Sequence, residues 1–262
     1  MDADAALDQP ITLVAIGGDP AAPFVPPRSL PAGSVVVAAD SGLDHLVRHG
    51  IAAHHVVGDL DSVAASSLER ARRDGARIHA HPSDKDATDL ELALDLVLAL
   101  VSGGAPPRLL VVGPGAGRLD LLLGDALLLS SPKLATLEVS ARIGPSALTV
   151  VRPGVPRRIV ATTGRAGEQV SILPVHGPAR GVTSAGLRWA LTDADLAPGT
   201  TRGLSNELVA AAAEVRLGDG VLVVVQPGSI AGAIAPRATP YDPTPRLPEP
   251  GRPDDPTPGD DR

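Results

Sequence analysis

The sequence contains no cysteine and almost no aromatic side chains. Phe24, Trp189 and Tyr241 are the only aromatic residues of these three types among 262 residues. Without cysteine the chain has no disulfide framework, no thiolate metal site and no cysteine nucleophile. Its core must therefore consist of Val, Leu, Ala and Ile. The 44% hydrophobic and 20% charged content predicts a packed globular protein.

The chain also lacks an extended basic run, a signal peptide and a membrane-spanning apolar segment. Its net charge of −7 argues against a nucleic-acid-binding surface. The N-terminus, Met1-Asp2-Ala3-Asp4, is acidic and has neither the basic region nor the apolar core of a signal peptide. No apolar run reaches the roughly 20 residues that cross a bilayer. We therefore expect a cytoplasmic protein with no nucleic-acid or membrane partner.

The chain changes composition along its length, which predicts three parts. Residues 236–262 are rich in Pro, Asp, Gly and Arg and have few large apolar groups. Such a segment cannot bury enough surface to offset the entropy of ordering, so we expect a disordered tail. We expect two domains before it, at 1–140 and 141–235.

In residues 1–140, short apolar runs alternate with helical segments. The predicted strands are 11–16, 34–39, 54–58, 76–80 and 108–112, and the predicted helices are 43–49, a helix from 66, 89–101 and one ending at 129. Ser66 with Glu69, and Thr88 with Glu91, have the spacing of a capping box. This alternation predicts an α/β domain with a mostly parallel sheet covered on both faces. Ligands of such sheets bind beyond the C-terminal ends of the strands.

From about residue 141 the pattern is that of a separate antiparallel β domain. Short strand-like runs at 146–151, 157–161 and 168–173 are separated by Gly and Pro. Residues 213–217 and 221–225 flank Gly218-Asp219-Gly220, which predicts a hairpin.

Two carboxylates follow the predicted strand at 54–58. In a strand-like continuation, Asp59 and Asp61 would point to the same side. Two converging acids repel each other unless a cation lies between them, and hard oxygen ligands favour Mg²⁺. The alternative is a polar loop in which Asp61 or Ser62 caps the next helix. These residues alone do not decide between the two.

Other charged residues lie at comparable positions. Asp40 and Asp120 follow predicted strands, and Asp89 heads a helix whose N-terminus could face a phosphate. Lys85 precedes that helix and is one of only two lysines; a point-charge ammonium suits a polyphosphate. Arg118 follows a glycine-rich turn and could clamp an anion. Each has a structural alternative, such as acids that stabilise a helix N-terminus. Together they indicate a site for metal and polyphosphate.

Trp189 has two interpretations. A lone tryptophan is more often a core anchor, but its ring can also be a flat stacking surface for a ligand.

These segments, in this order, resemble the motifs of the thiamine pyrophosphokinase family. The matching segments are Asp40-Ser41-Gly42, 58–62, 85–89 and 117–120. Residues 186–189 and Ser205-Asn206 resemble the thiamine-binding domain of that family. The resemblance covers about residues 11–228.

The resemblance implies a reaction and an architecture. Members transfer diphosphate from ATP to the hydroxyethyl group of thiamine, forming thiamine diphosphate and AMP. They have an α/β catalytic domain and a C-terminal β-sandwich, and they act as homodimers with sites at the subunit interface.

The resemblance also implies roles for individual residues. Mg²⁺ would be held by Asp59, Asp61 and Asp89, and the nucleotide phosphates would be positioned by Asp40, Lys85, Thr88 and Arg118. Trp189 would stack on the thiamine pyrimidine in a pocket lined by Ser205 and Asn206, and Asp120 would lie near thiamine or the metal. The catalytic set is then Asp59, Asp61, Asp89 and Asp120, with Asp61 as the candidate base.

Two positions depart from the family pattern. The family usually has His and Asn where this chain has Leu121 and Asp125. Leucine cannot donate a hydrogen bond, and Asp125 adds a charge. Two alternatives to thiamine diphosphate synthesis therefore remain: a pyrophosphokinase for another alcohol, such as a hydroxymethylpterin, and a non-catalytic protein that binds nucleotide or thiamine.

Overall fold

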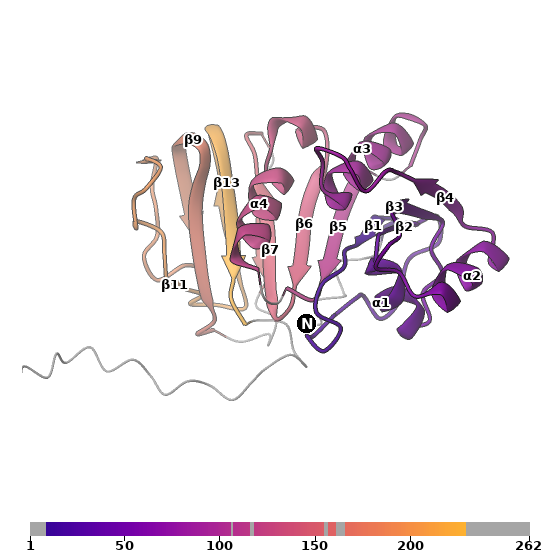
Figure 1. The fold of residues 1–262 in the computed structure, drawn as a ribbon. Helices are drawn as coiled ribbons and strands as arrows, with labels where there is room; N and C mark the ends of the chain where they lie inside the picture. Colours follow the sequence, from indigo (N-terminus) through magenta and orange to yellow (C-terminus); the bar gives the residue numbers. More distant parts are fainter. Residues whose placement is uncertain (1–8, 106, 116–117, 155–156, 161–165, 229–262) are drawn as a thin grey trace, which may run out of the picture.

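The structure is a computed structural model that describes residues 9–105, 107–115, 118–154, 157–160 and 166–228 (Figure 1). A parallel sheet with helices on its faces forms the first part of the chain, and antiparallel strands form the second part. The predicted tail at 236–262 lies outside the described residues. Within the described ranges, no helix is long and apolar enough to cross a membrane.

The parallel strands have the order β4-β3-β2-β1-β5-β6. They are β1 (Thr12–Ala15), β2 (Val35–Ala39), β3 (His55–Gly58), β4 (Arg77–Ala80), β5 (Arg108–Gly113) and β6 (Glu138–Ile143). The chain moves outward from β1 to β4 and then returns to β5 on the other side of β1. Strand order therefore reverses between β1 and β5, and the crevice beyond the C-terminal ends at such a point is the usual ligand site.

Helices cover both faces of these strands. They are α1 (Gly42–Arg48), α2 (Ala65–Arg73), α3 (Asp89–Ser102) and α4 (Leu119–Leu129), followed by a 3₁₀ turn at Pro132–Leu134. Successive strand residues point to opposite faces. Leu13 therefore packs in one apolar cluster with Leu43 of α1, whereas Val14 packs in another with Leu94 of α3. This burial of both faces confirms the predicted parallel architecture.

The two predicted capping boxes have different outcomes. Thr88 is the N-cap of α3, and its Oγ1 accepts a hydrogen bond from the Glu91 N–H at 3.2 Å. The prediction at Ser66 is wrong, because α2 begins at Ala65 with Ala64 as an N-cap that makes no side-chain bond. Ser66 already lies within the first turn. The alternative role of Asp61 or Ser62 as a helix cap is wrong for the same reason, since both precede Ala64.

The antiparallel strands form two layers joined by one long strand. They are β7 (Ser146–Val151), β8 (Arg157–Val160), β9 (Gln169–Ala185), β10 (Ala194–Leu196), β11 (Asn206–Glu207), β12 (Ala212–Arg216) and β13 (Asp219–Gln226). β9 has 17 residues; its earlier part pairs with β13 and its end pairs with β12. One apolar cluster, which includes Ile172, Val215 and Leu222, draws side chains from all three strands.

The hairpin predicted around Gly218-Asp219-Gly220 is wrong. β12 pairs with β8 and β9, whereas β13 pairs with β7 and β9. The turn therefore carries the chain across β9 from one layer to the other. Gly220 is required here: its φ is +96°, and a Cβ would lie 2.5 Å from the Pro178 carbonyl oxygen. The chain does turn at Gly218-Asp219-Gly220, but long-range pairing with β9 decides which strands β12 and β13 bond to.

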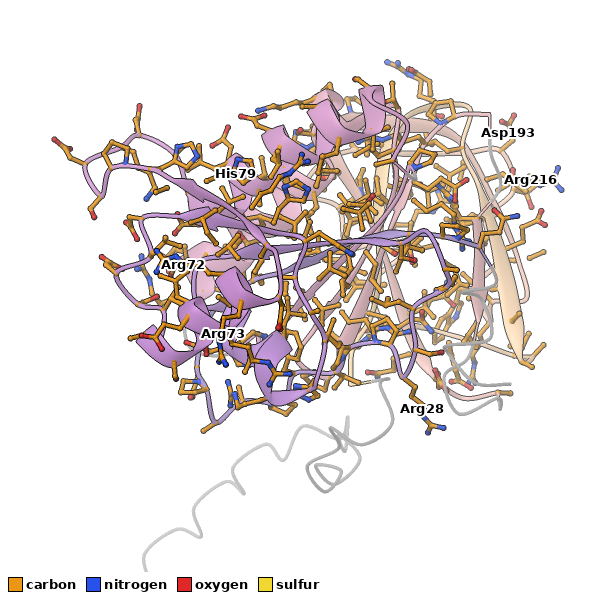
Figure 2. All side chains as sticks on the ribbon, turned by 90° about the vertical axis from the view of Figure 1, so that its right-hand side faces the viewer. Arg28, Arg72, Arg73, His79, Asp193 and Arg216 are labelled. Carbon is orange, nitrogen blue, oxygen red and sulfur yellow. The ribbon has the colours of Figure 1, made fainter. Side chains whose placement is uncertain are left out.

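Hydrogen bonding is continuous between the two parts of the chain. β6, at residues 138–143, pairs with parallel β5 on one side and antiparallel β7 on the other. One apolar cluster contains Val14 of the parallel part together with Leu148 and Val223 of the antiparallel part. The division at residue 140 stays a prediction. Charged side chains such as Arg72, Arg73 and Arg216 lie at the surface (Figure 2).

Candidate active site

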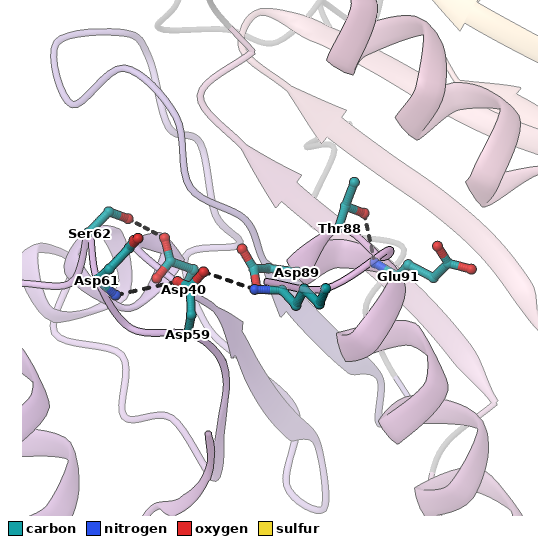
Figure 3. A network of polar contacts seen from close by, with 8 residues as sticks. Asp40, Asp59, Asp61, Ser62, Thr88, Asp89 and Glu91 are labelled. Atoms are coloured by element: carbon teal, nitrogen blue, oxygen red, sulfur yellow. Dashed lines mark hydrogen bonds and ion pairs between the residues drawn. The ribbon is translucent and has the colours of Figure 1, made fainter. Parts of the chain in front are cut away.

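Three carboxylates meet at the C-terminal ends of β2 and β3. Asp40 follows β2, and Asp59 and Asp61 follow β3. One carboxylate oxygen from each lies within 4.8 Å of the others (Figure 3). The hydroxyl of Ser62 donates a hydrogen bond to Oδ2 of Asp40. We call Asp40, Asp59 and Asp61 the acid cluster.

The backbone around the acid cluster takes conformations that few residues tolerate. Gly58 has φ +144°, and a Cβ there would lie 3.1 Å from Oδ1 of Asp89 and 3.2 Å from Cβ of Asp40. Leu60 and Asp40 are left-handed, with φ of +65° and +46°. Such residues cost of order 1–3 kcal/mol each and are concentrated at functional sites. The turn at Leu60, rather than the strand-like continuation expected from the sequence, brings Asp59 and Asp61 together.

Lys85 links the acid cluster to the start of α3. Its Nζ lies 2.9 Å from Oδ2 of Asp59 and 3.2 Å from Oδ1 of Asp89, and both the Lys85 and Asp59 side chains are largely buried. The structure thus places Asp40 beside Asp59 and Asp61, and it gives Asp89 the ammonium group as its partner. A direct metal contact by Asp89 stays a prediction.

The charges of this region perturb one another in opposite directions. The hydrogen bond from Lys85 lowers the pKa of Asp59, and the same bond raises the pKa of Lys85. The negative charge of Asp59 raises the pKa of Asp61 above its usual value. One ammonium therefore contacts both Asp59 and Asp89, while Asp61 lies close to the negative charge of Asp59 and, with smaller effect, to those of Asp40 and Asp89.

The donor set of the acid cluster fits a divalent hard cation. Three carboxylates from two adjacent strand ends offer oxygen ligands at short mutual distances. Oδ1 of Asp40 is buried and has no hydrogen-bond partner in the described part of the chain. Carboxylate oxygens, with water filling the remaining positions, are the usual protein ligands of Mg²⁺.

The N-terminus of α3 lies next to Lys85. Thr88 caps the helix as an acceptor, so its hydroxyl hydrogen can still bond to an anion. The free N–H groups and positive dipole end of α3 favour a phosphate at this place.

Arg118 and Asp120 form a pair at the start of α4. Nε of Arg118 lies 3.2 Å from Oδ1 of Asp120, and the side chains are 70% and 64% exposed. This contact lowers the pKa of Asp120 and raises that of Arg118. Gly117, which precedes them in the motif, lies outside the described residues. The pair is accessible to a ligand, but its predicted contacts to nucleotide or thiamine remain predictions.

Trp189 is 58% exposed, so the core-anchor interpretation is wrong. Its position is set by Asn206, which is 1% exposed. Oδ1 of Asn206 accepts from the Trp189 N–H at 3.1 Å, and its Nδ2 donates to the Trp189 carbonyl at 2.8 Å. The Arg188 guanidinium lies 5.3 Å from the centre of the indole ring. Asn206 therefore orients the tryptophan, while the ring faces solvent.

Ser205, next to Asn206, is exposed and left-handed, with φ +52°. Its backbone N–H donates to Oγ of Ser171 on β9 at 3.1 Å. The structure therefore places Ser205 and Trp189 at the surface of the antiparallel part, where the buried Asn206 follows Ser205 in the chain and bonds to the backbone of Trp189.

Sequence reasoning missed residues that support the acid cluster. Oδ2 of Asp44 on α1 accepts from the Ala64 N–H at 3.1 Å and so ties down the loop that follows Asp61. Nothing in the sequence distinguishes Asp44 from an ordinary acid in a first helical turn. Ser62 could have been found, because it is adjacent to Asp61. Gly17 also matters: a Cβ there would lie 2.2 Å from Oγ of Ser41, which precedes α1.

Comparison with known proteins gives consistent results. The family model "Thiamin pyrophosphokinase, catalytic domain" matches residues 28–140, and "Thiamin pyrophosphokinase, vitamin B1 binding domain" matches residues 157–222. The chain is 24% identical over 190 residues to a thiamine pyrophosphokinase of Bacillus subtilis (strain 168), covering 72% of this chain and 86% of that protein.

Solved structures of similar proteins share the fold. The crystal structure of thiamine pyrophosphokinase from Bacillus subtilis has a TM-score of 0.69 at 21% identity, covering 85% of this chain and all of the other. The thiamin pyrophosphokinase from Candida albicans has a TM-score of 0.63 at 14% identity, covering 82% and 89%.

The two family models match in order, one over the strands and helices that build the acid cluster and the other over the strands that carry Trp189 and Asn206. Together they span more than half of the chain. The chain belongs to the thiamin pyrophosphokinase family, which forms thiamine diphosphate from thiamine.

Proposed function

We propose that this chain transfers the terminal diphosphate of ATP to the hydroxyethyl oxygen of thiamine, releasing AMP, with Mg²⁺ held at the acid cluster. The observation that carries the proposal is the convergence of Asp40, Asp59 and Asp61 beside Lys85 in a chain that also has the vitamin B1 binding domain. The match to that domain disfavours a pterin alcohol as the substrate.

Residues at the strand ends and at the start of α3 would position the phosphates of ATP. Asp40, Asp59 and Asp61 would hold Mg²⁺, which neutralises charge on the transferred group and polarises its phosphorus. Lys85 and the N-terminus of α3 provide fixed positive charge next to the cluster. Asp89 also holds the Lys85 ammonium, at 3.2 Å from its Oδ1.

Bond making needs a proton acceptor for the primary alcohol. The hydroxyethyl oxygen attacks the β-phosphorus of ATP, the bond from that phosphorus to the α-phosphate oxygen breaks, and AMP leaves. Asp61 is the acceptor we assign, because it is the exposed member of the acid cluster and would lie beside the bound Mg²⁺.

The exposed ring of Trp189 supports stacking with the thiamine pyrimidine, and Asn206 holds the backbone that presents the ring. We assign the exposed Arg118 to the nucleotide phosphates and the exposed Asp120 to thiamine or the metal. Use of ATP favours a cytoplasmic location.

We also propose that the enzyme is a homodimer through α4. Leu119, Leu123 and Leu127 recur every fourth residue and are 68%, 58% and 49% exposed. They form one apolar stripe along the helix, which a second copy would cover. Sedimentation should show a dimer that Leu123→Glu converts to a monomer; an unchanged monomer in both proteins would contradict the proposal.

The reaction is tested by measuring AMP and thiamine diphosphate from ATP, Mg²⁺ and thiamine by chromatography. We expect equimolar products that disappear with a chelator. Asp59→Asn should lower the rate by about 100-fold or more, because it removes charge stabilisation of the transition state. Asp84→Asn, which changes an exposed acid in the loop between β4 and α3, is the matched control. Full activity in Asp59→Asn would rule out the proposed site.

A further inference from the structure

A cavity of about 330 Å³ lies between α4 and the sheet, and none of the acid-cluster residues lines it. Its walls come from α4, β6, β7 and β13, and Figure 1 shows α4 lying over these strands. The lining is mostly apolar and includes Leu122, Leu129, Ile143 and Leu148. A cavity of this volume accommodates a ligand with one ring.

Among the described residues that line the cavity, Asp125 is the only ionisable one. Within the described chain it has no hydrogen bond or ion pair to a side chain, and burial alone raises its pKa to about 6. An acid without a partner in apolar surroundings costs free energy, which a complementary charge would recover. Asp125 is also the residue that stands where the family usually has Asn, and nothing in the proposed reaction uses it.

We propose that this cavity binds a compact organic cation, with its apolar body against the leucines and its positively charged nitrogen against the Asp125 carboxylate. An anion would be repelled by Asp125. A neutral apolar molecule would leave the carboxylate unpaired, and a metal ion would find only one carboxylate ligand among the lining residues. A single, partly buried acid on a mostly apolar wall is complementary to an ammonium or azolium group.

The inference does not depend on the proposed function. A ligand of this chemistry could be thiamine itself, whose thiazolium is an organic cation, or a separate small amine. If thiamine is the ligand, it will displace another cation from the cavity; if the ligand is a separate amine, thiamine will not.

The test uses the full chain and three probes of matched shape: benzylammonium, benzyl alcohol and benzoate. Binding is measured at pH 8 by calorimetry or by ligand-observed NMR. We expect benzylammonium to bind about tenfold or more tightly than benzyl alcohol, because a bond to a charged partner is stronger than one to a neutral partner. Benzoate should not bind. Asp125→Asn keeps the shape of the side chain and should abolish the preference for the cation.

A second variant separates an effect on the cavity from a general effect on folding. Ala147→Leu narrows the cavity but keeps Asp125, so it should weaken both benzyl probes. Equal affinity of the native protein for the cation and the alcohol would overturn the proposal, as would a cation preference that survives Asp125→Asn. Absence of benzylammonium binding to the native protein would also overturn the proposal. If the oligomeric state of Asp125→Asn then differs from that of the native protein, the partner of Asp125 is a cation of a second subunit. Displacement of benzylammonium by thiamine would identify the substrate as the ligand, and persistence would identify a separate amine; both outcomes support a cation site.

Discussion

Replacing Asp125 with asparagine should stabilise this protein, and the gain should depend on pH. The carboxyl has a pKa of about 6 in the folded chain against the usual 3.8. Between these values the unfolded chain loses its proton while the folded chain keeps it, so stability falls as pH rises from about 4 to 6. The full difference corresponds to about 3 kcal/mol at pH 8. Because the side chain keeps some contact with solvent, we expect about 1–2 kcal/mol.

The assay is thermal unfolding of the native protein and Asp125→Asn at pH 8 and pH 4.5. A gain of 1–2 kcal/mol should raise Tm by about 3–6 °C at pH 8 for a chain of this size. At pH 4.5 about a third of the gain should remain, because the folded carboxyl then stays protonated and this pH lies less than one unit above the pKa of the unfolded carboxyl. Asp84→Asn removes an exposed acid and serves as the control. An equal gain at both pH values, or none at pH 8, would refute the assignment of Asp125 as a desolvated acid.

Two further predictions concern the site. Without Mg²⁺ at pH 7, Asp61→Asn should raise Tm, because it removes the repulsion that raises the pKa of Asp61; added Mg²⁺ should stabilise the native protein more than the variant. A variant destabilised in chelator would contradict this view of the acid cluster. Asn206→Ala removes both bonds to the Trp189 backbone, so the KM for thiamine should rise about tenfold while the KM for ATP changes little. An unchanged thiamine KM and unchanged Trp189 fluorescence would show that Asn206 does not orient the ring.

Local patterns in the sequence were enough to predict the parallel part of the fold. Apolar runs followed by Gly and Asp marked strands buried on both faces, and Thr88 marked the start of α3. These features depend on neighbours within a few residues, which the sequence displays directly. The same reasoning failed at Gly218-Asp219-Gly220, because strand partners there are set by β9, more than thirty residues earlier in the chain.

The candidate site shows the same division. The sequence showed that Asp40, Asp59, Asp61, Lys85 and Asp89 follow strands or begin a helix, and parallel strand ends share one edge of a sheet. It could not show which acids face one another. That depended on the left-handed turn at Leu60 and on the position of Lys85 between Asp59 and Asp89.

By itself, the sequence determined the residue types available for chemistry: oxygen ligands and cations at strand ends, no thiol, and one tryptophan with an asparagine following Ser205. Only the tertiary structure decided that Trp189 is exposed, that the Asn206 side chain bonds to the Trp189 backbone, and that Asp125 lies unpaired in an apolar cavity. The physical reason is that exposure, pairing and pKa depend on which distant segments pack together, and these are properties of neighbours in space rather than of neighbours in the chain.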